Sequence, residues 1–217
     1  MHKGYSNPLL LDMVLAIMPM FETRRLTLRP ITLDDAPATQ WLFPHWEIVR
    51  FLGHNIPWPY PEDGALQFYR DTALPAIERG EQWIWGIRLK EGPSHLIGCV
   101  SLNLMRDNNR GFWVGLPWQG KGIMSEASEV VTEFWFNALG REKLRVAKAV
   151  GNIASRRITE KQGAHLVSVE NRVFRMGLTK AEIWEITRDE WNTRRYRAPR
   201  IETGVPARAE FPASPTG

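Results

Sequence analysis

The sequence predicts an α+β fold in which a mixed, mostly antiparallel central sheet is flanked by helices. Residues 25–29 alternate polar and apolar side chains, as a half-buried strand does. Three further strand-like segments, 82–89, 96–104 and 111–116, are separated by turns too short for a parallel crossover. Residues 122–139 carry apolar side chains three and four positions apart, which predicts a long helix with one buried face.

Capping residues and turn signals predict the other elements. Thr32–Asp35 supplies capping oxygens for a short helix, and Pro61 with the acidic residues after it opens a second helix that ends near Gly80. Residues 43–61 hold four Pro and two Trp, so we expect a loop there. Beyond residue 140 we expect a strand at 144–150, a helix at 154–162, and strands at 166–174 and 181–186.

Length and charge predict one central domain with an extra segment at each end. We expect an N-terminal extension over residues 1–20, a core domain over 21–191 and an Arg- and Pro-rich, poorly ordered tail over 192–217. The tail holds five Arg against two Glu, so it carries +3 of the net charge of +4, and the rest of the chain is nearly neutral. A nucleic-acid reader concentrates positive charge on a folded face, so nucleic acid is an unexpected partner.

The cysteine and histidine content predicts a cytoplasmic protein without a metal site. Cys99 is the single cysteine, which excludes an internal disulfide, and its apolar neighbours predict a buried, unreactive thiol. The five His show no spacing typical of metal ligands. The apolar run 9–20 is shorter than the roughly 20 residues that a membrane span needs, and Met20 is an alternative first residue for the natural protein.

The loop Trp118–Met124 is the best candidate for a ligand site. It follows a predicted strand and opens a long helix, so it exposes backbone N–H groups at the positive end of a helix dipole. Gly120 and Gly122 allow the backbone to approach a phosphate closely, and Lys121 adds positive charge. On composition alone, an ordinary strand-to-helix turn explains the glycines equally well.

A nucleotide-binding P-loop is an alternative for the same segment. Residues 115–122 nearly match GxxxxGK[ST], but Gly122 stands where a magnesium-binding hydroxyl is required. The strands before the loop are predicted to be antiparallel, whereas a P-loop strand belongs to a parallel sheet. We therefore exclude an NTPase.

Two motifs resemble the GNAT superfamily of acetyltransferases. Residues 118–127, WQGKGIMSEA, are similar to its acetyl-CoA loop, in particular to the W-x-G-x-G-[YLI]-[AM]-x-E-A loop of the branch that acetylates ribosomal-protein N-termini. Residues 152–163, NIASRRITEKQG, resemble that branch's N-x-x-S-x-x-[VI]-x-x-K-x-G. The resemblance covers residues 21–191 and implies a GNAT fold and an acetyl-CoA-dependent N-acetyltransferase.

The resemblance assigns candidate roles by position. In the family the pantetheine arm of CoA pairs with the strand end, here Val114–Leu116, and that end polarises the thioester carbonyl. The resemblance implies that Asn152 binds cofactor or substrate. It also implies that Ser155, at the matching position of that branch, protonates the departing thiolate or binds CoA, whereas the Tyr that many GNAT enzymes use as donor has no counterpart here. Without the resemblance, a helix cap would be the better interpretation of Ser155, and an ordinary turn residue would be the alternative for Asn152. The positions that match the family's pyrophosphate contacts are Gln119, Gly120, Lys121, Gly122, Ile123 and Met124; Met124 replaces a small residue of the wider pattern.

The sequence is consistent with two acceptors of the acetyl group, a protein N-terminus and a small primary amine. We expect direct attack by the amine in a ternary complex, with no general base assigned. The alternative is a non-catalytic module that binds or senses acyl-CoA. A homodimer is expected only by analogy with the fold. The residues that could line an acceptor pocket are Trp41, Trp46, Trp58 and Trp184.

Overall fold

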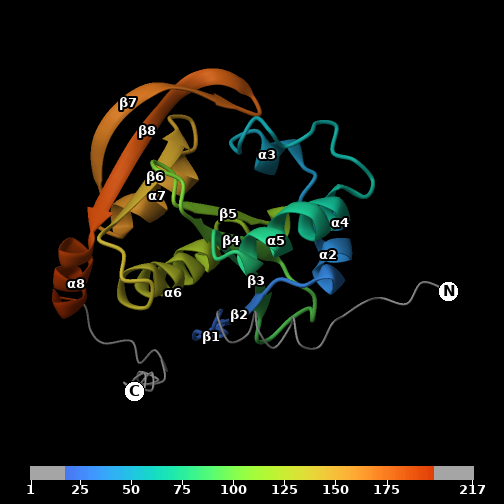
Figure 1. Ribbon diagram of the computed structural model, residues 1–217, viewed down its shortest axis with the longest axis horizontal. Helices are drawn as coiled ribbons and strands as arrows, with labels where there is room; N and C mark the ends of the chain where they lie inside the picture. The colour runs from blue at the N-terminus through green and yellow to red at the C-terminus, as the bar shows by residue number, and fades with distance from the viewer. Residues whose placement is uncertain (1–17, 198–217) are drawn as a thin grey trace, which may run out of the picture.

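The computed structural model describes residues 18–197, which form two antiparallel sheets with helices packed against them (Figure 1). Five strands lie in sequence order in the first sheet: β1 (Phe21–Glu22), β2 (Leu26–Pro30), β3 (Gln82–Leu89), β4 (Gly98–Asn103) and β5 (Arg110–Val114). The second sheet has the order β6-β8-β7, with β6 (Lys143–Ala149), β7 (His165–Phe174) and β8 (Gly177–Thr187). The predicted α+β class is confirmed. The strands of the predicted central sheet are divided into two sheets, with the division between β5 and β6.

The predicted helices are present in the predicted order, but α3 (Trp46–Val49) lies inside the predicted loop 43–61 and α8 (Arg188–Arg197) was not predicted. The other helices are α2 (Ala36–Leu42), α4 (Gly64–Phe68), α5 (Leu74–Glu78), α6 (Ile123–Asn137) and α7 (Ile153–Lys161), with short 3-10 turns at Leu33–Asp35 and Leu116–Trp118. Residues 69–73 between α4 and α5 are π-helical, so the predicted second helix is not uniformly α-helical. Pro75 lacks the N–H that would donate to residue 71, which accounts for the change of spacing at this point.

The main core lies between the five-stranded sheet and the helices. Residues 83–87 of β3 are buried one after another, so both faces of the sheet are covered. Helix α6 contacts β2, β4, β5 and β6 and buries the apolar face that its sequence predicts, including Val131 and Trp135. Cys99 is buried as predicted, and burial raises the pKa of its thiol to about 12.

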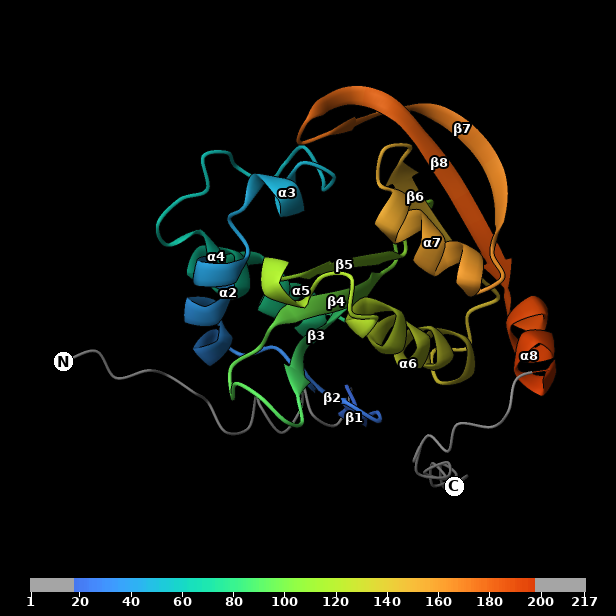
Figure 2. The same cartoon turned by 180° about the vertical axis from the view of Figure 1, so that it is seen from behind.

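Backbone hydrogen bonds connect the two sheets where β5 and β6 begin. The N–H of Asn109 donates to the carbonyl of Arg145 at 2.7 Å, and the N–H of Arg145 donates to the Asn109 side chain at 2.8 Å. One step along, the N–H of Ala147 donates to the Asn108 side chain at 3.2 Å. Two asparagine amides thus replace a regular ladder, and beyond them β5 and β6 separate (Figures 1 and 2).

The predicted domain boundaries differ from the extent of the folded elements. Helix α8 crosses the predicted boundary between residues 191 and 192, because the Trp191 side chain is fully buried and Arg194 binds Glu129 at 2.9 Å. At the other end, Met18 is buried and the carbonyl of Pro19 accepts a hydrogen bond from the Trp85 indole. The rest of both predicted end segments, 1–17 and 198–217, lies outside the described residues. None of the helices within 18–197 is long and apolar enough to cross a membrane.

Candidate functional site

The loop Gln119–Gly122 adopts a backbone that only glycine accepts readily. Gly120 and Gly122 have φ angles of 72° and 74°, in the left-handed region. Helix α6 begins directly after Gly122, and no side chain of residues 18–197 caps its first N–H groups. The Gln119 side chain donates to the carbonyl of Val114 at 3.2 Å, which ties the loop to the end of β5.

The predicted loop residues differ in what they can offer a ligand. The side chains of Ile123 and Met124 are buried in the core, so only their backbone N–H groups can face a ligand. Lys121 is exposed. Strand β5 ends at Val114, two residues earlier than predicted, and Leu116 begins a 3-10 turn with a partly exposed side chain.

A network of hydrogen bonds from the β1–β2 turn holds this loop. Glu126 on α6 accepts from the Thr23 hydroxyl at 2.5 Å, the Arg25 N–H at 2.9 Å and the Arg25 guanidinium at 2.7 Å. The same guanidinium donates to the carbonyl of Lys121 at 2.9 Å. Burial alone would raise the pKa of Glu126, but the hydrogen bonds from Thr23 and Arg25 outweigh it and the pKa is lowered. Glu126 is therefore a charged brace between α6 and the loop.

The second motif begins helix α7 beside the separated strands. The Asn152 side chain caps α7 by accepting from the N–H of Ser155 at 3.2 Å. The Ser155 hydroxyl oxygen accepts a hydrogen bond of 2.7 Å from the Nζ of Lys148 in β6. That Nζ also lies 5.1 Å from the centre of the Phe112 ring in β5. Lys148 thus connects β5, β6 and α7 at the point where the sheets part.

Lys148 was missed by reasoning from the sequence alone. Leu144, Val146 and Lys148 alternate along β6 and share its buried face, where the first two are apolar. A lysine at the third such position is the signal that could have identified it. In the structure Lys148 is 5% exposed and Ser155 is 7% exposed.

The interior around Lys148 is electropositive. Burial lowers the pKa of Lys148 well below its ordinary value, and the positive charge of Arg110 lowers it further. Arg110 is itself buried, which lowers its pKa to about 10, and Glu129 offsets only part of this effect. One Arg110 nitrogen donates to the Thr132 hydroxyl at 2.5 Å, while its Nε and Nη2 have no acceptor among the described residues. Such a region favours a ligand group that carries or develops negative charge.

Comparison with known proteins identifies this arrangement. The family described as the acetyltransferase (GNAT) domain matches residues 25–165, more than half of the chain. The chain belongs to the GNAT acetyltransferase family. The predictions that it is a GNAT protein and an N-acetyltransferase are thereby confirmed.

Relatives of this GNAT chain support the same class. YoaA of Bacillus subtilis (strain 168), named as an uncharacterized N-acetyltransferase, is 30% identical over 153 residues, which cover 68% of this chain and 83% of YoaA. RimL, a ribosomal L7/L12 alpha-N-protein acetyltransferase solved with coenzyme A, has a TM-score of 0.66 at 16% identity over 77% of this chain and 97% of RimL. The ribosomal-protein-S5-alanine acetyltransferase from Vibrio fischeri has a TM-score of 0.67 at 17% identity over 79% of this chain and 98% of its own. At these identities the two structures show the shared fold.

The segment predicted as a loop before α4 lies against the tip of the β7–β8 hairpin (Figures 1 and 2). The Arg175 guanidinium at that tip donates to the carbonyls of His54 and Ile56 at 3.1 and 2.9 Å. Trp46 and Trp58 lie 5.3 Å apart by ring centres and are 39% and 38% exposed. These two indoles are available to an acceptor.

The other two predicted acceptor tryptophans lie in different surroundings. Trp41 is largely exposed beside His95, at 6.0 Å between ring centres. Trp184 is buried, and its indole N–H donates to Glu182 at 3.0 Å. Burial leaves Trp184 little surface for an acceptor.

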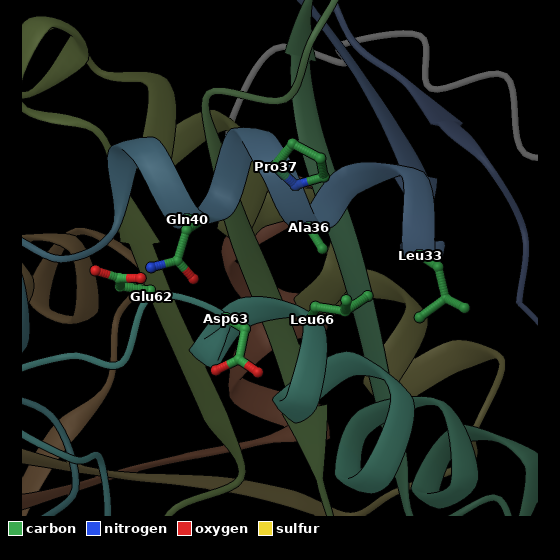
Figure 3. A pocket seen from close by; sticks show the side chains of 7 residues that line it. All are labelled: Leu33, Ala36, Pro37, Gln40, Glu62, Asp63 and Leu66. Atoms are coloured by element: carbon green, nitrogen blue, oxygen red, sulfur yellow. The ribbon is translucent and has the colours of Figure 1, made fainter. Parts of the chain in front are cut away.

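A hollow between α2 and α4 is separate from this site (Figure 3). It has a volume of about 270 Å³, and the Gln40 side chain bridges its end through the carbonyl of Pro61 and the N–H of Ala65. Its lining contains no residue predicted to bind CoA: Leu33, Ala36, Pro37, Gln40, Glu62, Asp63 and Leu66. Within residues 18–197 no group of three His, Cys, Asp or Glu side chains could hold a metal ion.

Proposed function

We propose that this chain transfers an acetyl group from acetyl-CoA to a primary amine by direct attack in a ternary complex. The observation that carries the proposal is the separation of β5 from β6, with the glycine loop following β5 and Ser155 beside Lys148 at the parting. RimL, which shares the fold, was solved with coenzyme A. Both supports agree with the acetyl-CoA predicted from the sequence.

The proposed cofactor site uses backbone more than side chains. The uncapped N–H groups at the start of α6 and the loop Gln119–Gly122 would hold the pyrophosphate, because they combine free donors with the helix dipole. Lys121 would add charge at the exposed rim. In the described part of the chain no strand pairs with the edge of β5 that faces β6, so the amides of pantetheine would pair there near Val114 and continue to Leu116.

The proposed chemistry needs a neutral amine, a polarised carbonyl and a proton for the thiolate. Backbone N–H groups at the end of β5 would stabilise the oxyanion of the tetrahedral intermediate. Ser155 would give its hydroxyl proton to the sulfur as the C–S bond breaks, and Asn152 fixes Ser155 by capping α7. Asn152 would also offer its amide nitrogen, which has no acceptor among the described residues, to cofactor or substrate.

We propose that the acceptor, a protein N-terminus or a small amine, binds near Trp46 and Trp58. A near-neutral body gives no reason to select a polycation. We place the enzyme in the cytoplasm because a sequence with one cysteine has no internal disulfide and suits a reducing compartment. The proposed catalytic domain spans residues 18–197, since Met18 and Trp191 are both buried in its core.

The test measures acetyl-CoA binding by calorimetry together with release of the CoA thiol over a panel of peptides, amino acids, polyamines and aminoglycosides. We expect binding in the absence of acceptor and thiol release with at least one class of amine. Absence of acetyl-CoA binding would overturn the proposal. Tight binding without thiol release for any amine would favour the acyl-CoA-sensing alternative.

A further inference from the structure

We propose that Lys148 supplies, through the Ser155 hydroxyl, the proton that the departing thiolate receives. This inference rests on the acetyl transfer proposed above. In this inference Ser155 contacts the sulfur. Lys148 contacts Ser155 and not the sulfur, and it acts as a positioning residue and proton source.

The hydrogen bond between the two side chains has the direction that such a relay needs. Lys148 donates to the Ser155 oxygen at 2.7 Å, so the serine is used as an acceptor. A serine hydroxyl has one proton to donate, and the Ser155 proton has no acceptor among residues 18–197. The proton of Ser155 is therefore free to point at a ligand while Lys148 holds the oxygen.

Within residues 18–197 no carboxylate forms an ion pair with Lys148. Glu182 is its cross-strand neighbour on β8, but the Glu182 carboxylate is bound to Arg156 of α7 and to the Trp184 indole. On the β5 side Lys148 faces the Phe112 ring and the charge of Arg110. Among the residues that the structure describes, the Lys148 amine contacts the Ser155 hydroxyl and the Phe112 ring and has no other polar partner.

This environment makes Lys148 a better acid than an ordinary lysine. Desolvation and Arg110 both destabilise its protonated form and lower its pKa, which brings it towards the range of a thiol, about 8.5 for free cysteine. A proton donor works best when its pKa lies close to the operating pH. A lysine kept only for packing would gain nothing from this shift, since burying a charge costs stability.

The step balances in atoms and charge. The amine nitrogen bonds to the carbonyl carbon, the C–S bond breaks, and its electron pair stays on sulfur. The sulfur takes the Ser155 proton, and Ser155 takes a proton from the Lys148 ammonium, which becomes neutral. Water accepts the proton lost by the amine nitrogen, and Lys148 regains a proton from water before the next turnover.

The experiment compares kcat across pH for the wild type and for Lys148→Met, Lys148→Arg, Ser155→Ala and the Lys148→Met/Ser155→Ala double variant. Lys180→Met is the matched control, because Lys180 is an exposed lysine on the neighbouring strand β8. We expect Lys148→Met to lower kcat by about 10- to 100-fold with an unchanged Kd for acetyl-CoA. The double variant should lose no more than Ser155→Ala alone, because the two groups act in series.

The pH profile separates a relay from a structural role. In the wild type kcat should fall at alkaline pH as Lys148 loses its proton, and Lys148→Arg should move that fall to higher pH. Lys148→Arg keeps a cation, so it tests the relay even if Lys148→Met unfolds. The inference would be overturned if both Lys148 variants had the kcat of the wild type and the same fall in kcat at alkaline pH. It would also be overturned if mass spectrometry detected acetylation of Lys148 itself. A wild type that binds no acetyl-CoA would instead refute the proposed function.

Discussion

The five-stranded and three-stranded sheets bury their residues in different ways. Strand β3 in the first sheet is buried over five consecutive residues, with Trp85 and Ile87 fully inaccessible. Strand β7 in the second sheet is exposed along most of its length, and Val169 is 51% exposed. Charged groups are buried where the two sheets face each other, at Arg110 of β5 and Lys148 of β6.

This difference assigns stability to the five-stranded sheet and the proposed chemistry to the facing edges of the two sheets. Continuous apolar burial in the five-stranded sheet stabilises the fold, because the favourable free energy scales with the apolar area removed from water. Buried cations at the facing edges reduce stability, and proteins retain such costs mainly at functional sites. We expect variants inside the first sheet to change unfolding and variants at the facing edges to change binding or turnover.

The largest expected effect tests the role of the first sheet. Ile87→Ala should lower the free energy of unfolding by about 2–5 kcal/mol, because it leaves a cavity in a covered strand. Val169→Ala on the exposed β7 should change it by less than about 0.5 kcal/mol. Urea denaturation of both variants measures the contrast, and equal losses would show that the two sheets contribute alike.

The next effect falls on the cofactor loop. Gly122→Trp should weaken acetyl-CoA binding by about 100-fold, or about 2.7 kcal/mol, because the side chain would fill the approach to the loop N–H groups. Gly140→Trp is the matched control, since Gly140 has a similar φ of 64° but follows α6 instead of preceding it. If both variants bind acetyl-CoA equally well in calorimetry, the loop is not the cofactor site.

Ser155→Ala tests the chemistry at the facing edges. It should lower kcat by about 10- to 100-fold while the Kd for acetyl-CoA changes little, because the lost group acts on the leaving thiolate. Ser128→Ala is the control, since Ser128 is a fully buried serine on α6 whose hydroxyl has no partner among the described residues. A parallel rise in Kd without a change in kcat would assign Ser155 to binding alone.

The smallest expected effect concerns the brace under the loop. Glu126→Gln should lower the free energy of unfolding by about 1–2 kcal/mol at neutral pH, because charged hydrogen bonds to Thr23 and Arg25 are lost. The folded-state pKa of Glu126 is lowered, so its stabilisation is complete above its ordinary pKa and is lost as pH falls through the lowered value.

Thermal unfolding of the wild type and Glu126→Gln at several acidic pH values follows this loss. The gap between the two proteins should close as pH falls. Glu81→Gln, which breaks an exposed ion pair with Arg79, should cause no measurable change at any pH. A gap between wild type and Glu126→Gln that is constant with pH would exclude a charged brace.

The order of most elements could be predicted because local patterns specify it, although α3 and α8 were not predicted. Alternation along residues 25–29 and apolar spacing along 122–139 correspond to β2 and α6 within a few residues. The π-helical turn at 69–73 was not predicted, because it depends on how the helix adjusts next to Pro75. The candidate site was predicted as two motifs, at 118–124 and 152–155, whose joint action depends on their placement in space.

The sequence by itself determined the fold class, the family and the loop that follows β5, since turns, amphipathic periodicity and glycine positions act over a few residues. Only the tertiary structure brought Arg25 to Glu126, which lie 101 residues apart in the chain. It also made Lys148 a buried cation, because the desolvation of one amine depends on β5, α7 and β8 closing around it. A pKa and a proton path depend on such neighbours, and one strand's pattern does not specify them.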